Sequence, residues 1–296
     1  MRIDALNCGG AALAEYCRGR HELCAAGVCS SGISLEDASG RLVLMHDVNC
    51  GSLPFGLAGR GIKDRAKELE ISAGDTLIID GGRLLRADGT LLANIGYTPE
   101  NPVIPMLLAD EWTAFIRREG GRLLAESGRS QLAIFASVRS EDIDRTALED
   151  PFAAAGLAGM RRLERGLAAG DSEEISAGLD GLLGLGRGLT PSFDDFIVGA
   201  AAALNFLSRE FSAELSGRAE LCRVMTEKSD RTNKYSAAYL RAAAAGGRIS
   251  AIDDMLALAG SGEWPAAAER LLSVGGSSGA DMTSGCIFAA RIISGR

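Results

Sequence analysis

The chain has few of the residues on which several common kinds of functional site are built. It has only two histidines, His21 and His46, which argues against a histidine-rich metal site or a proton relay built on imidazole groups. Its seven cysteines are scattered and form no Cys-x-x-Cys pair, which argues against a zinc ribbon and a disulfide framework. We therefore expect reduced cysteines and a cytoplasmic protein.

An excess of positive charge is absent as well. Acidic residues outnumber basic ones by 39 to 31, and no cluster of Lys and Arg forms a stripe, so nucleic acid is not an expected partner. The longest apolar run, from Phe196 to Leu207, is interrupted by Asn205 and is shorter than the roughly 20 residues that span a bilayer. We expect no membrane association and a sizeable globular core, since 47% of the residues are hydrophobic.

The first third of the sequence predicts short strands joined by turns rich in glycine and aspartate. The expected strands are residues 23–28, 41–47, 76–80, 83–86 and 90–93. Helical patterns dominate from Pro102 onward, apart from one further strand predicted at 131–137. The sequence thus predicts an α+β fold, with an antiparallel β-rich region over 1–150 and a mostly helical region over 151–296.

The stretch from Gly184 to Gly199 is the densest in groups able to do chemistry. Glycine stands at every second position from 184 to 188, and Thr190 and Pro191 follow as the expected N-cap and first helical residue. Backbone N–H groups would then point at one spot and form an anion cradle. A plain helix break would explain the glycines, but one acid would satisfy the helix dipole, whereas Asp194 and Asp195 are adjacent. Neither nucleotide-binding fingerprint fits, so no nucleotide cofactor is expected.

A second segment repeats part of this pattern near the C-terminus. Ser192-x-x-Asp195-x-x-x-Gly199 superimposes on Ser278-x-x-Asp281-x-x-x-Gly285. In both, Ser and Asp have the spacing of a capping box, and the glycine lies one helical turn after the Asp, where it permits close approach of a backbone or a ligand. Two ordinary helix caps would share this spacing. We favour two helix N-termini that converge on one site.

A third polar run, from Ser229 to Ser236, precedes an alanine-rich helix. Arg231 would neutralise an anion there, because its planar guanidinium group suits carboxylate or phosphate, and Thr232 would add a hydrogen bond. A solvated loop that caps the next helix is the commoner fate of such a run.

The chain resembles the AllH-like family, the third subunit of bacterial oxamate carbamoyltransferase. Three segments carry this resemblance in the same order along the chain, namely Gly184 to Gly199, Arg231-Thr232 and residues 277–281. The family run is similar to Gly-Leu-Gly-Pro-Gly-Leu-Thr-Pro-Ser-Gly-Asp-Asp-Phe. Arg187 stands in place of the proline and Phe193 in place of the last glycine. The arginine adds a charge that would help to hold an anion, and the phenylalanine would restrict the approach of a ligand. A paralogue with an altered substrate would show such departures.

The resemblance implies a subunit of a complex that exchanges oxalurate and phosphate for oxamate and carbamoyl phosphate, in the use of allantoin and purine nitrogen. The residues themselves predict a small anionic ligand at the helix starts. The candidate ligand-binding residues are Gly186, Arg187, Gly188, Thr190, Ser192, Arg231, Thr232, Ser277 and Ser278. The alternative is a non-catalytic assembly subunit, whose alanine-rich helices contact other carbamoyltransferase subunits.

Three carboxylates are the candidate catalytic residues, namely Asp194, Asp195 and Asp281. They would orient the transferred amide, move a proton, or share a Mg²⁺ ion, since carboxylate and hydroxyl donors select a hard cation. A cation or a proton is needed because carboxylates repel a bound anion. We expect the version in which the carboxylates share a Mg²⁺ ion. The sequence leaves the oligomeric state open, a homo-oligomer included.

Overall fold

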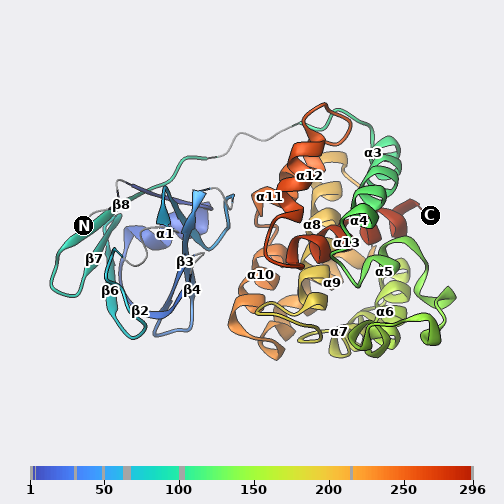
Figure 1. The fold of residues 1–296 in the computed structure, drawn as a ribbon, viewed down its shortest axis with the longest axis horizontal. Coiled ribbons are helices and arrows are strands. Elements are labelled where there is room, and N and C mark those ends of the chain that lie inside the picture. Colours follow the sequence, from blue (N-terminus) through green and yellow to red (C-terminus); the bar gives the residue numbers. More distant parts are fainter. Residues whose placement is uncertain are drawn as a thin grey trace. The chain divides into compact units, whose positions relative to one another are not determined.

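The computed structural model describes residues 3, 5–29, 32–48, 51–62, 68–99, 104–213 and 216–294, which form two compact units (Figure 1). One unit consists of Met1–Pro102 with Gly247–Ser250, and the other of Val103–Gly246 with Ala251–Arg296. The units divide near residue 102 rather than near 150. Asp150 does not mark a domain boundary, because its side chain caps a helix of the second unit by accepting from the N–H groups of Phe152 and Ala153.

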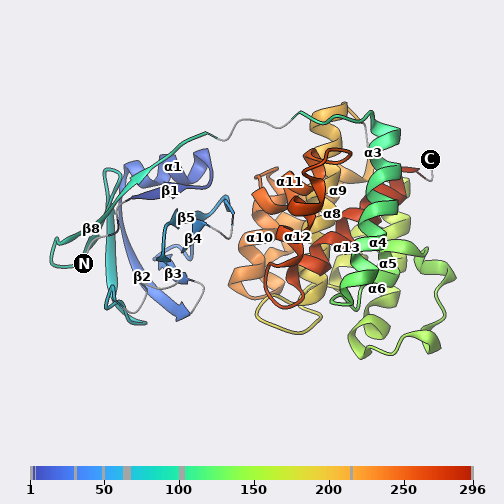
Figure 2. The ribbon, with the colours of Figure 1, turned by 45° about the horizontal axis from the view of Figure 1, so that its top comes forward.

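The described part of the N-terminal unit is a closed barrel with the strand order β1-β5-β4-β3-β2-β6-β7-β8 (Figure 2). The strands are β1 (Leu6–Cys8), β2 (Arg20–Cys29), β3 (Gly32–Asp37), β4 (Leu42–Asp47), β5 (Gly56–Gly59), β6 (Thr76–Asp80), β7 (Arg83–Arg86) and β8 (Leu91–Gly96). A helix, α1 (Ala11–Arg18), follows the first strand. Apolar side chains such as Leu23, Ile33 and Leu77 are buried in one core.

The prediction of an antiparallel β-region is wrong, because the barrel is mixed. β4 and β5 pair in parallel, with Leu44 opposite Gly56, and β1 and β8 pair in parallel and close the barrel, with Leu6 opposite Ile95. The strands β1, β3 and β5 were not predicted, and β1 and β5, with three and four residues, are too short to show a period. The meander of β6, β7 and β8 is antiparallel as predicted.

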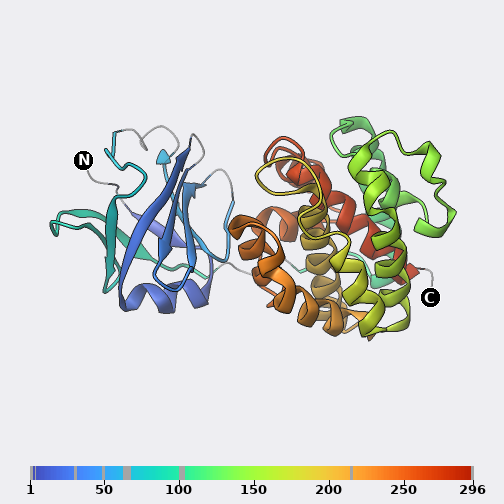
Figure 3. The same cartoon turned by 90° about the horizontal axis from the view of Figure 1, so that it is seen from below.

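The second unit is helical (Figures 1 and 3). Its helices are α3 (Ala109–Phe115), a π-helical turn (Ile116–Gly120), α4 (Gly121–Ser127), α5 (Ala133–Ser137), α6 (Pro151–Ala169), α7 (Ser172–Asp180), α8 (Ser192–Phe211), α9 (Ser216–Lys228), α10 (Lys234–Ala244), α11 (Ser250–Ala257), α12 (Trp264–Leu272) and α13 (Ser278–Ser294). The strand predicted at 131–137 is helix α5, because a short buried apolar run suits either element. No helix within the described ranges is long and apolar enough to cross a membrane.

Helices α8 and α13 pack along each other in the middle of this unit and are flanked by α5, α10 and α12 (Figure 2). Their contact is reciprocal at the two repeated glycines. A Cβ atom on Gly199 would lie 2.0 Å from the carbonyl oxygen of Met282, and one on Gly285 would lie 1.9 Å from that of Phe196. Only glycine fits at such distances. The repeated motif therefore brings two helix backbones together, as its spacing predicted.

Candidate functional site

The glycine-rich loop has the backbone shape that its sequence predicts. Gly184, Gly186 and Gly188 all have positive φ angles, of 78°, 135° and 95°. Helix α8 begins at Ser192, with Pro191 as its N-cap, so the predicted start was one residue too early. The N–H group of Phe193 donates to the carbonyl oxygen of Leu185 over 3.1 Å and ties the loop to the helix.

Backbone donors of this loop and of the first residue of α8 remain for a ligand. Among the residues that the structure describes, the N–H groups of Gly186, Gly188 and Ser192 donate to no backbone carbonyl. Gly186 is pressed against the start of α8, since a Cβ atom there would lie 2.2 Å from the nitrogen of Ser192. The loop and the first turn of α8 thus form one continuous backbone surface with unsatisfied donors, which suits an anion.

The starts of α8 and α13 meet through their side chains. The hydroxyl oxygens of Thr190 and Ser278 are 3.0 Å apart, and the Thr190 hydroxyl donates to Oδ2 of Asp195 over 2.8 Å. Thr190, Ser192, Ser277 and Ser278 are all half-buried, so they form a polar rim with the carboxylates behind it. The structure therefore brings together the two segments that the sequence predicted to converge.

Asp195 lies behind this rim with only 1% of its surface exposed. Burial raises the pKa of its carboxyl group to about 8, although hydrogen bonds with Thr190 and Ser278 act in the opposite direction, and the negative charges of Asp281 and Asp194 raise it further. The group is largely protonated at pH 7. A neutral carboxyl group donates a hydrogen bond and does not repel an anion.

Asp281 is the equivalent acid of α13 and is equally buried, at 1% exposed. Burial raises its pKa to about 6, against the hydroxyl groups of Ser130, Ser277 and Ser192, which lower it. The group is therefore mostly ionised at pH 7.5. Ser130 donates to its Oδ1 over 2.5 Å, whereas its Oδ2 is buried and accepts no hydrogen bond among the described residues.

Ser130 was missed by the sequence reasoning. It lies in the loop between α4 and α5, where the surrounding Gly128, Arg129 and Gln131 form no recognisable motif. Its hydroxyl group accepts from Ser284 over 3.1 Å and from the N–H group of Leu132 over 3.1 Å. These two donors leave the Ser130 hydrogen directed at Asp281. Only the fold brings this loop to the start of α13.

Asp194 differs from Asp281 because both of its carboxylate oxygens accept hydrogen bonds within the protein. The N–H group of Gly184 donates to Oδ1 over 2.8 Å, and the Thr232 hydroxyl donates to Oδ2 over 2.5 Å. Asn233 caps α10 and also donates to the carbonyl oxygen of Leu189 over 2.8 Å. Asp194 thus fastens the glycine loop to the third polar run and has no oxygen left for a ligand.

Both candidate arginines are engaged elsewhere. Arg231 forms an ion pair with Asp180, and Arg187 lies 3.4 Å from Asp150 and over the ring of Phe152. The prediction that either one neutralises a bound anion has no support in these contacts.

The expectation for Phe193 is corrected by its packing. Its ring is buried, and a Cβ atom on Gly156 of α6 would lie 2.3 Å from it. The ring also packs beside Phe135, with 5.9 Å between ring centroids. The side chain that replaces the family glycine therefore points into the core and leaves the turn open.

The predicted Mg²⁺ bridge has no support in the arrangement of the acids. Within the described ranges, no group of three or more His, Cys, Asp or Glu side chains is placed to hold a metal ion. Asp194, Asp195 and Asp281 each bond to a different hydroxyl group instead, those of Thr232, Thr190 and Ser130. Magnesium stays an untested prediction.

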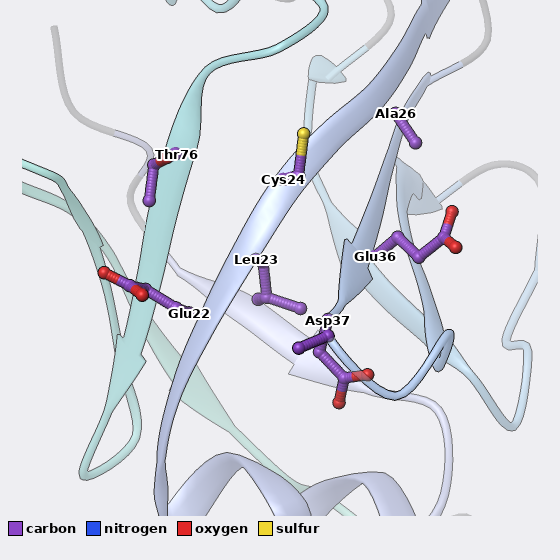
Figure 4. A pocket seen from close by; sticks show the side chains of 8 residues that line it. Glu22, Leu23, Cys24, Ala26, Glu36, Asp37 and Thr76 are labelled. Atoms are coloured by element: carbon purple, nitrogen blue, oxygen red, sulfur yellow. The ribbon is translucent and has the colours of Figure 1, made fainter.

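A hollow of about 410 Å³ lies on the barrel and contains none of the predicted site residues (Figure 4). It is lined by Glu22, Leu23, Cys24, Ala26, Glu36, Asp37, Ala38 and Thr76. One of its acids, Asp37, already accepts hydrogen bonds from the hydroxyl groups of Tyr16 over 2.8 Å and Ser39 over 2.6 Å. This hollow offers acidic side chains without any positive group among its lining residues, so it does not suit an anion.

A family model described as oxamate carbamoyltransferase subunit AllH matches residues 182–290. The match spans the glycine-rich loop, α8, the third polar run and the start of α13, and leaves the barrel outside. It confirms the predicted resemblance to the AllH-like family over these residues. No match was found among curated proteins or among solved structures.

Proposed function

We propose that this chain, whose residues 182–290 match the AllH family, is a subunit of an oxamate carbamoyltransferase complex and binds a small anion where α8 and α13 begin. The family match supports the first part. One observation carries the second, namely the 3.0 Å contact between the hydroxyl groups of Thr190 and Ser278, which joins the two helix N-termini. Other carbamoyltransferase subunits are the partners that this proposal requires.

The anion is held by backbone donors. The N–H groups of Gly186, Gly188 and Ser192 donate to it, and the positive ends of two helix dipoles add to the attraction. The proton on Asp195 removes the repulsion between this carboxyl group and the anion without a metal ion, whereas Asp281 keeps its negative charge. Phosphate, carbamoyl phosphate, oxalurate and oxamate all carry the negative charge that such a site binds.

Asp195 is the acid that we assign to proton transfer. When phosphate attacks the carbamoyl carbon of oxalurate, the C–N bond breaks and the departing nitrogen of oxamate takes up a proton. A carboxyl group with a pKa of about 8 holds that proton at neutral pH and is close to the value at which general acids work best. Asp194 keeps the loop in place and takes no part in this step.

A second candidate function, a non-catalytic assembly subunit, is favoured by a different observation. Gly199 and Gly285 serve the packing of α8 against α13, and the three carboxylates are each only 1% exposed. In this alternative the whole cluster stabilises the helix crossing, and the carbamoyl transfer takes place on other subunits.

The anion site is tested by calorimetric titration of the full chain with phosphate and with oxamate, in the presence and absence of Mg²⁺. Gly188→Ala is the test variant and Gly246→Ala its control, because both glycines are exposed, have positive φ and have room for a methyl group. Both substitutions add similar backbone strain. We expect binding without Mg²⁺ that weakens only in Gly188→Ala, and equal binding by the two variants would refute the site.

Reconstitution with candidate partner subunits separates the two functions. If the chain binds the substrate, Gly188→Ala will still assemble with its partners but form carbamoyl phosphate more slowly. Wild-type activity in that variant would favour the assembly subunit. The cytoplasmic location expected from the cysteines remains a prediction for either function.

A further inference from the structure

We infer that Asp281 is a specificity-determining residue of the proposed anion site, and that its Oδ2 accepts a hydrogen bond from an amide N–H group of the ligand. This inference rests on the proposed function. It narrows the ligand from any small anion to an anion that also carries a terminal amide group.

The carboxylate of Asp281 is held in one orientation. Ser130 donates to Oδ1 over 2.5 Å, and Ser130 is itself fixed by Ser284 and by the N–H group of Leu132. Among the described residues Oδ2 has no hydrogen-bond donor, and Asp281 is only 1% exposed. A buried acceptor without a partner is costly, so a ligand that supplies a donor gains the free energy that the empty protein lacks.

Groups close to this oxygen are placed to contact the charged end of the ligand. The hydroxyl groups of Ser192 and Ser277 interact with Asp281, and both side chains are half-buried. Each hydroxyl group moves by rotation about a single bond, and the inference requires that these two short side chains turn so that a ligand reaches Oδ2. The N–H group of Ser192 then faces the charged end of the ligand, and Oδ2 faces its amide end.

The chemistry separates two small anions of the same charge and nearly the same shape. Oxamate carries an –NH₂ group where pyruvate carries a methyl group. An ionised Oδ2 accepts from the first and finds no donor on the second. Discrimination of about tenfold or more is expected when a buried acceptor is left unpaired in this way.

The experiment is a calorimetric titration of the full chain with oxamate, pyruvate and phosphate. Asp281→Asn is the test variant, since Ser130 keeps the amide oxygen of the new side chain and places its –NH₂ group where Oδ2 was. Asp150→Asn is the matched control, because it removes a charge that raises the pKa of Asp281 while Asn still caps α6. Ser130→Ala tests the positioning residue and is expected to reduce the preference for oxamate severalfold.

Wild type and Asp150→Asn are expected to bind oxamate about tenfold more tightly than pyruvate, and Asp281→Asn is expected to lose this preference while still binding phosphate. Equal binding of oxamate and pyruvate by the wild type would overturn the inference and leave the anion site intact. This comparison does not depend on whether a variant folds. An unchanged preference in Asp281→Asn would overturn it as well. Failure of the wild type to bind any of the three anions would overturn the proposed function itself.

Discussion

Replacement of Asp195 by Asn should remove a large part of the pH dependence of stability in the helical unit. An aspartate in an unfolded chain has a pKa of about 3.9. In the folded protein burial raises the pKa of Asp195 to about 8. Between these two values the folded state holds a proton that the unfolded state has released, so the free energy of unfolding falls as the pH rises.

The size of the effect follows from this difference in bound protons. The free energy of unfolding falls by about 1.4 kcal/mol per pH unit for one such group. The contribution is complete below about pH 4 and is lost by about pH 8. From pH 5 to pH 8 the wild type should therefore lose about 3–4 kcal/mol relative to Asp195→Asn. Asp281, with a pKa of about 6, lowers the free energy of unfolding of both proteins in the same direction between about pH 4 and pH 6.

The assay is urea unfolding at pH 5, 6, 7 and 8, followed by tryptophan fluorescence. Both tryptophans of the chain, Trp112 and Trp264, are buried in the helical unit, so the signal reports this unit and not the barrel. Asp171→Asn is the control, because Asp171 is an exposed N-cap that Asn also serves. Parallel pH profiles of wild type and Asp195→Asn would refute the argument that this acid is protonated in the folded protein.

Three other predictions concern single side chains. Gly285→Ala should cost about 1–3 kcal/mol or more in urea unfolding, because its methyl group meets the carbonyl oxygen of Phe196, whereas Gly121→Ala, with open space around it, should stabilise by up to about 1 kcal/mol. Thr232→Val should cost about 1–3 kcal/mol, since it leaves Oδ2 of Asp194 without a donor, and equal stability would contradict that clamp. Arg187→Ala should change stability by less than about 1 kcal/mol and leave calorimetric oxamate binding unchanged.

Local signals in the sequence predicted much of the helical site. Alternating glycines predicted the positive φ angles of the loop, and the repeated Ser-Asp-Gly spacing predicted the meeting of two helix starts. Both signals work because they depend on backbone geometry, which a short stretch of sequence determines. The adjacent Asp194 and Asp195 predicted a special environment. The sequence did not predict that both oxygens of Asp194 accept hydrogen bonds within the protein, or that Asp195 is protonated.

Contacts between distant segments could not be predicted in the same way. Ser130 reaches Asp281 only because the loop before α5 packs beside α13, and Arg231 turns to Asp180 because α7 lies next to α9. The closure of the barrel escaped prediction for a related reason, since β1 pairs with β5 and β8, which both lie far from it along the chain. A single sequence carries no record of such pairings.

The most direct test of the central claim is the response of backbone amide signals to oxamate, measured by nuclear magnetic resonance on the labelled full chain. The account predicts saturable shifts at Gly186, Gly188, Ser192 and Ser278, and no shifts at Gly170 and Gly246, which have positive φ angles but lie outside the proposed site. Saturable shifts confined to other residues, or none at all, would contradict an anion site at the starts of α8 and α13.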